Sequence, residues 1–203
     1  MPLVTLVAAL VASGMVLEPT SERQRWLDFS DYPSNELRQG RGGVAVVKVI
    51  IAPTGVPEQC LIVSSSGNEV INKIVCDLSM KRLRFKPPIS ETGKPTYGIW
   101  QRRAVMLPPG WTAALKPEET SNFKIRLDAP PSIRKSAEVR TIVSVDDSGN
   151  FLGCGTADIE SDASLIENAC DHIKRVWQPA PERNMAGNPI TYVRWAQIEF
   201  IVH

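Results

Sequence analysis

The chain has 203 residues, 43% of them hydrophobic, and a net charge of +1, which together describe an ordinary globular protein with one or two hydrophobic cores. Neither the net charge nor any cluster of lysine and arginine indicates a protein that binds nucleic acid, because contact with phosphates requires clustered positive charge. We therefore expect no nucleic-acid partner.

The longest apolar segment is the amino terminus, whose run of about fifteen residues is shorter than the roughly 20 that a membrane-spanning helix needs. Leu3–Val11 fits the hydrophobic segment of a secretory signal, and Ala12–Gly14 offers the small residues that a signal peptidase accepts. We predict a signal peptide at residues 1–16, so that the protein contacts a membrane only through this end and only if it is uncleaved. The alternative is a first core strand.

The next part of the sequence reads as strand, turn, strand, helix and strand. An apolar run at Val44–Ala52 indicates a strand covered on both faces, and Pro53–Gly55 is typical of a turn. Ser66 and Glu69 have the spacing of a helix capping box, and apolar residues then recur at helical spacing as far as Phe85. The remaining elements are a second strand at Cys60–Ser65 and a closing strand at Tyr97–Leu107.

A linker rich in proline and charged residues is predicted at residues 108–121, and the same series of elements then follows again. Residues 123–127 predict an extra strand that opens the second series. Asp162 is the expected helix cap, and apolar residues from Leu165 to Trp177 recur at helical spacing. The closing strand of this series is expected at Thr191–Val202.

The second series is a copy of the first. Cys60 and Cys76 are sixteen residues apart, as are Cys154 and Cys170, and the first cysteines of the two pairs are 94 residues apart. A period this long indicates a duplicated domain, because solenoid units have about 20 to 50 residues. We predict an α+β protein with two tandem domains, each a three-stranded antiparallel sheet (ββαβ) packed by one helix. The predicted domains are residues 30–107 and 122–203.

Each copy places one cysteine on its second strand and the other on the helix that packs over the sheet. We predict the disulfide bonds Cys60–Cys76 and Cys154–Cys170, because strand and helix neighbours approach within bonding range. Closing a loop of about fifteen residues stabilises a domain by roughly 3 kcal/mol in the chain-entropy model. An even cysteine count and a secretory start favour disulfides over buried reduced thiols.

Two other chemistries fit the cysteines less well. A zinc site prefers closely spaced ligand pairs, whereas the spacing here is sixteen, with only His172 and His203 to help. The alternative function is a secreted thiol/disulfide-active or other small enzyme that uses Cys60 or Cys154. A thiol enzyme needs a base beside its nucleophile, and the first copy has Leu78 where the second has His172.

Other catalytic motifs are absent from the sequence. It contains no nucleophile elbow, no zinc-protease motif and no phosphate-binding loop. The acidic residues between Asp146 and Asp162 lack the order of a calcium-binding loop, and turn and helix-cap roles account for most of them. We therefore expect no enzyme, no metal and no cofactor.

The first copy, from "YPSNELRQGRGG" to "SETGKP", resembles the carboxy-terminal domain of the TonB energy-transducer family. Tyr32 and Pro33 are similar to the opening motif of that family, Gly43 stands before the first strand, and Gly55 stands at the hairpin. The second copy resembles the family from Val139 onward without a Tyr-Pro opening, as a diverged duplicate would.

The resemblance implies a periplasmic, non-enzymatic module that binds a protein or peptide partner. Such domains add a short segment of an outer-membrane receptor as a strand to their sheet edge, which links them to transport across that membrane. A three-stranded sheet offers such an edge, because its outer strands keep unpaired backbone groups.

The expected partner-binding edge is the closing strand of the first copy, because the strand with Cys60 is covered through its disulfide to the helix. Trp100 is expected to be an aromatic anchor, and Arg102 and Arg103 to meet an acidic or polar peptide. The alternative is that this edge is blocked, either by the second copy or by the two arginines as guards against aggregation. The predicted edge residues are Tyr97, Ile99, Trp100, Gln101, Arg102 and Arg103.

Overall fold

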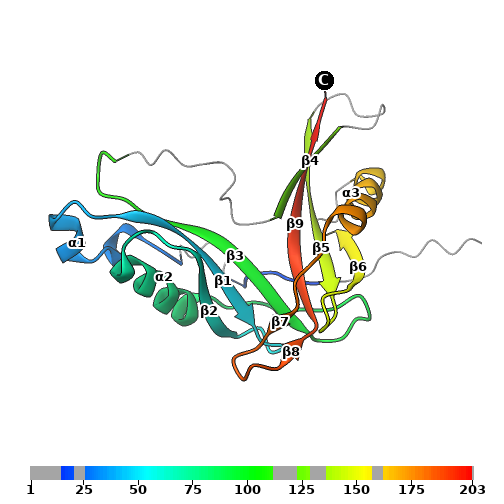
Figure 1. Cartoon of the computed structure of the whole chain (residues 1–203), viewed down its shortest axis with the longest axis horizontal. Helices are drawn as coiled ribbons and strands as arrows, with labels where there is room; N and C mark the ends of the chain where they lie inside the picture. The colour runs from blue at the N-terminus through cyan, green and yellow to red at the C-terminus, as the bar shows by residue number, and fades with distance from the viewer. Residues whose placement is uncertain (1–14, 21–25, 112–122, 129–135, 157–161, 203) are drawn as a thin grey trace, which may run out of the picture.

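The computed structural model of the chain describes residues 15–20, 26–111, 123–128, 136–156 and 162–202. This part of the chain is α+β, as predicted, with three α-helices, one large mixed sheet and a two-stranded hairpin (Figure 1). The first half contains the 3-10 helix η1 (Phe29–Asp31), α1 (Ser34–Arg38), β1 (Gly43–Ile51), β2 (Pro57–Ser64), α2 (Glu69–Arg82) and β3 (Tyr97–Met106). The second half contains β4 (Phe123–Asp128), β5 (Ala137–Val145), β6 (Phe151–Thr156), α3 (Ala163–Val176), β7 (Glu182–Arg183), β8 (Pro189–Ile190) and β9 (Tyr192–Ile201).

One seven-stranded sheet runs through both halves, in the order β2-β1-β3-β9-β5-β6, with β4 paired to a further part of β9. Within each half the neighbouring strands of this order are antiparallel, whereas β3 and β9 are parallel and pair at Tyr97–Ile99 with Tyr192–Arg194. The prediction of two separate three-stranded domains is therefore wrong. Each closing strand leaves an edge of unpaired backbone groups, and here the first part of each edge pairs with the other, at Tyr97–Ile99 and Tyr192–Arg194.

The geometry of the first half is repeated in the second. The helix α3 begins 94 residues after α2, which is also the offset from Cys60 to Cys154. Val49 of β1 lies opposite Cys60, and Val143 of β5 lies opposite Cys154. The chain thus builds the same hairpin, helix and disulfide twice and joins the two through their closing strands.

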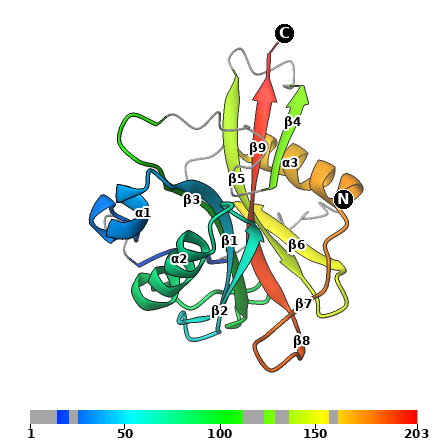
Figure 2. The ribbon, with the colours of Figure 1, turned by 60° about the vertical axis from the view of Figure 1, so that its left-hand side comes forward.

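The two helices cover opposite faces of the sheet. The core around Ile71 of α2 includes Trp195 of β9, whereas the core around Ile173 of α3 includes the next residue, Ala196. Successive residues of a strand point to opposite faces, so α2 and α3 lie on different sides. Figure 2 shows α2 beside β1 and β2, and α3 beside β5 and β6.

The turn between β1 and β2 and the turn between β5 and β6 both require glycine. Gly55 has φ +84°, and a Cβ there would lie 2.1 Å from the carbonyl oxygen of Phe85. Gly149 has φ +87°, and its Cβ would lie 2.8 Å from the carbonyl oxygen of Pro179. Only glycine combines this backbone conformation with so close an approach of another segment.

The ends of the helix α2 differ from the prediction. The cap is Asn68, whose side-chain oxygen accepts from the amides of Val70 and Ile71, so the predicted capping box of Ser66 and Glu69 is wrong. Ser66 instead donates to the carbonyl oxygen of Asn68. The helix ends at Arg82, three residues before Phe85. In the second half the predicted cap, Asp162, is confirmed, since it accepts from the amide of Ser164.

Each half also places a loop on the other. The ammonium group of Lys48 lies 2.8 Å from both carboxylate oxygens of Glu182, at the start of the β7–β8 hairpin. Asn184 of the same hairpin donates to the hydroxyl of Tyr97 at 3.2 Å. In return, the hydroxyl of Thr96 donates to the carbonyl oxygen of Thr191 at 2.9 Å. These contacts support the short seam between β3 and β9.

The amino-terminal prediction falls largely on residues outside the described part of the chain, which begins at Met15. Met15 and Leu17 are buried in the core of the first half, and Val16 pairs with Ile89 through its backbone. The last two residues of the predicted signal segment therefore belong to the folded structure. Among the described residues no helix is long and apolar enough to cross a membrane. The predicted linker, 108–121, lies outside the described residues from position 112 onward.

Candidate partner-binding edge

The first part of the predicted edge is occupied. Tyr97 and Ile99 pair with β9 across the seam between the halves, so their edge is not open to a partner. This corrects the prediction of an open strand from its first residue. The alternative of an edge blocked by the second half applies to these residues alone, because β3 and β9 diverge beyond them (Figure 1).

Trp100 belongs to the core. Its side chain is only 4% exposed and packs edge-on against Trp26 and Phe85, with ring centroids 5.6 Å and 6.0 Å away. It lies opposite Val49 on the face that α2 covers. The residue expected to be an aromatic anchor is therefore buried in the core.

The rest of β3, Gln101–Met106, is hereafter called the open β3 edge. It pairs with β1 on one side, and on the other side no strand of the described part of the chain pairs with it. Arg102 is exposed and Arg103 is half-buried, and as consecutive strand residues they point to opposite faces. Val105 is 42% exposed. The predicted edge residues that remain available are thus Gln101, Arg102 and Arg103.

The family-like residues hold the far end of the open β3 edge in place. The hydroxyl of Tyr32 donates to the carbonyl oxygen of Arg41 at 2.8 Å and lies 3.5 Å from that of Met106. Burial raises the pKa of the Tyr32 hydroxyl above its usual value. Pro33 precedes α1, and a Cβ on Gly43 would lie 2.3 Å from the carbonyl oxygen of Ser66. These residues have a structural role beside the edge.

A buried carboxylate connects α1 to the start of α2. Glu36 is 4% exposed and accepts from Nε and Nη2 of Arg41, at 2.8 Å and 2.6 Å, and from the amide nitrogen of Asn68 at 2.5 Å. A groove of about 530 Å³ lies beside this cluster, with the exposed side chain of Trp111 in its wall. Glu36 was not among the predicted residues. The signal in the sequence for its ion pair is Arg41, five residues later.

The Glu36 cluster predicts a specific response to acid. Hydrogen bonds from Arg41, and second from Asn68, lower the pKa of Glu36 from 4.5 to about 2. A lowered pKa stabilises the fold fully above the unfolded pKa, and this contribution is lost as the pH falls toward 2. We expect the free energy of unfolding of the wild type to fall more steeply between about pH 5 and pH 3 than that of Glu36→Gln. Urea unfolding at several pH values measures both, and parallel curves would contradict the assignment.

All four cysteines are in disulfide bonds, Cys60–Cys76 and Cys154–Cys170, with Cα–Cα distances of 5.6 Å in both. Neither Cys60 nor Cys154 is therefore a free thiol in this structure. Within the described residues no group of three or more histidine, cysteine, aspartate or glutamate side chains could hold a metal ion.

Comparison with protein families finds a match between residues 30–104 and the model of the Gram-negative bacterial TonB protein C-terminal. The matched part, which is less than half of the chain, is similar to that domain. No second copy is matched, although the second half repeats the geometry of the first. No curated protein and no solved structure matches the chain. TonB C-terminal domains are periplasmic and non-enzymatic, and both disulfides suit an oxidising compartment.

Proposed function

We propose that this protein is secreted to the periplasm and binds an extended segment of an outer-membrane receptor by strand addition at the open β3 edge. The proposal assigns binding to the first half, residues 30–107, and support of the seam to the second half, residues 122–203. It makes the protein a partner-binding module with TonB-like interactions in transport, without a catalytic role.

The observation that carries the proposal is that, among the described residues, only β1 pairs with Gln101–Met106, within and just beyond the part that matches the TonB C-terminal domain. Backbone amides and carbonyls along such a side offer a ready ladder to an extended segment. The side-chain charges favour an acidic segment, since Arg102 and Arg103 lie on the two faces of this strand. An incoming strand with acidic residues at adjacent positions meets one arginine on each face.

The first experiment locates the partner. A photoreactive amino acid replaces Val105, which is 42% exposed on the open β3 edge, and in a control it replaces Val176, which is 53% exposed at the end of α3. We expect crosslinks in living cells from position 105 to an outer-membrane receptor and none from position 176. Equal crosslinking from both positions, or none to a receptor from position 105, contradicts the proposal.

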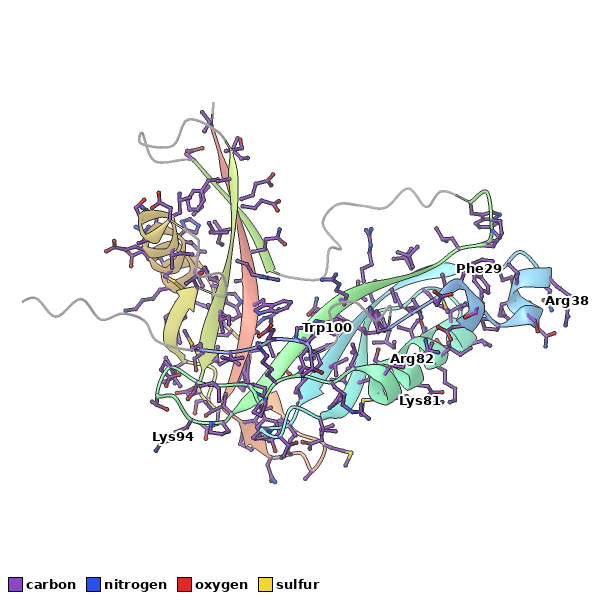
Figure 3. All side chains as sticks on the ribbon, turned by 180° about the vertical axis from the view of Figure 1, so that it is seen from behind. Phe29, Arg38, Lys81, Arg82, Lys94 and Trp100 are labelled. Atoms are coloured by element: carbon purple, nitrogen blue, oxygen red, sulfur yellow. A yellow bond between two sulfur atoms is a disulfide. The ribbon has the colours of Figure 1, made fainter. Side chains whose placement is uncertain are left out.

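The second experiment tests the charge. R102E/R103E is expected to reduce binding of a receptor segment by roughly tenfold or more at low salt, since it replaces two attractions by repulsions. The matched control is K81E/K94E, which changes the net charge equally on α2 and on the loop before β3 (Figure 3). Fluorescence anisotropy with a labelled segment measures both. Equal loss in the two variants would assign the effect to net charge and contradict a role of this edge.

A further inference from the structure

The two closing strands hold the same place in the repeat. Ile51 lies opposite Gly98, and Val145 lies opposite Tyr192, so both ladders have the same register 94 residues apart. The open β3 edge therefore corresponds to Trp195–Phe200 of β9. A strand that pairs with this stretch of β9 therefore shows what kind of segment the open β3 edge can bind.

That stretch of β9 carries a strand. β4 pairs with it in parallel, from Phe123 opposite Ala196 to Asp128 opposite Ile201. β3 occupies the preceding stretch of the same β9 edge. In the described part of the chain β4 pairs with no strand other than β9, and its Leu127 packs against the core of the second half. The chain itself thus fills on β9 the place that remains open on β3.

The first half uses the corresponding segment differently. Residues 29–34 precede β4 by 94 positions and form η1 and the start of α1 instead of a strand. Asp31 is held there by an ion pair with Arg82 at 2.5 Å. Pro33 has no backbone N–H to donate to a ladder. The segment that could close the first half is therefore held out of the β3 ladder, and its Tyr32 reaches only Met106 at the end of that strand, near the place where Figure 3 shows Phe29.

We propose that β9 is a second strand-acceptor edge, held closed by the chain's own β4, and that it takes an extended basic and apolar segment when β4 is displaced. The idea that a partner strand binds at this edge rests on the proposed function. The pairing of β4 with β9 does not depend on it. The register supplies the charge preference: the basic Arg126 is opposite the acidic Glu199 in the backbone ladder, whereas Lys124 is opposite the uncharged Gln197. The open β3 edge carries two arginines instead, so the two edges select segments of opposite charge.

The test removes β4 from the β9 edge by mutation and then adds β4 as a separate peptide. In the variant K124P/L127P, prolines at positions of opposite parity remove at least one β4 amide that faces β9. The probe is the labelled synthetic peptide NFKIRLD, which is residues 122–128, and its control is NFEIELD. We expect the variant to bind NFKIRLD at least tenfold more tightly than the wild type does, one peptide per chain. A photoreactive group at Gln197 should crosslink to it.

Equal affinity of the wild type and a folded variant overturns the proposal, as does equal affinity of the variant for NFKIRLD and NFEIELD. If the variant does not fold, hydrogen exchange of the wild type decides. The proposal requires β4 amides to exchange at least tenfold faster than those of β5 through local opening, and equal rates overturn it. The receptor-segment experiments probe β3 alone, so failure of the proposed function and failure of this second edge are separate results.

Discussion

Trp100→Ala is expected to destabilise the protein by about 3–5 kcal/mol, the usual cost of truncating a large buried aromatic side chain. Trp100 is 4% exposed and packs against Trp26, Phe85 and the α2 face of the sheet. Its loss leaves a cavity that these neighbours fill only in part. Urea unfolding followed by circular dichroism measures the change.

The control for Trp100 is Val105→Ala on the same strand, where the side chain is 42% exposed and the expected cost is within about 0.5 kcal/mol. The two variants also distinguish a role of Trp100 in the core from a role in contacting a partner. A partner-contacting tryptophan would weaken binding of a receptor segment in Trp100→Ala with little change in stability. That result would contradict the structural role of Trp100 and return this residue to the binding edge.

The repeat and the disulfides were accessible from the sequence because they depend on local spacing. The offset of 94 residues between Cys60 and Cys154 recurs in the helices, and the hairpin glycines Gly55 and Gly149 both adopt a positive φ. Spacing of this kind is set within one supersecondary unit, where residues that are close in the sequence are also close in space. Asp162 as a helix cap belongs to the same class of prediction.

The seam between β3 and β9 was not accessible in this way. Each closing strand by itself predicts an open edge, and nothing in the alternation of Tyr97–Met106 or Tyr192–Ile201 states which other strand pairs with it. The burial of Trp100 was missed because β3 does not alternate regularly, with Gly98, Ile99 and Trp100 all buried in succession. Its face follows from the register with β1, where Trp100 lies opposite Val49.

The candidate site stays a prediction. Arg102 and Arg103 lie on a stretch of β3 that only β1 pairs with in the described part of the chain, whereas Tyr97 and Ile99 lie in the seam. The strand at residues 123–127 was predicted and is β4, but its pairing with β9 was not, since a short strand carries no sign of the strand that it joins. Long-range pairing is what a single sequence specifies least directly.

Removing both disulfides is expected to destabilise the protein by about 6 kcal/mol, roughly 3 kcal/mol for each loop of sixteen residues in the chain-entropy model. A loss of this size is comparable with the whole stability of many proteins, about 5–15 kcal/mol. We therefore expect the variant with alanine at all four cysteines to be largely unfolded at 37 °C. The two single-disulfide variants, C60A/C76A and C154A/C170A, should remain folded.

The single-disulfide variants also test whether the fused sheet makes one cooperative unit. The seam joins β3 to β9 over Tyr97–Ile99, and Lys48 and Glu182 form an ion pair across the halves. If these contacts couple the halves, each variant unfolds in urea in one transition, at the same midpoint by far-ultraviolet circular dichroism and by tryptophan fluorescence. Two separate transitions, with the half that lacks its disulfide unfolding first, would mean that the halves fold independently. The second half would then support the open β3 edge only through the short seam, and a partner strand long enough to reach Tyr97 could displace β9.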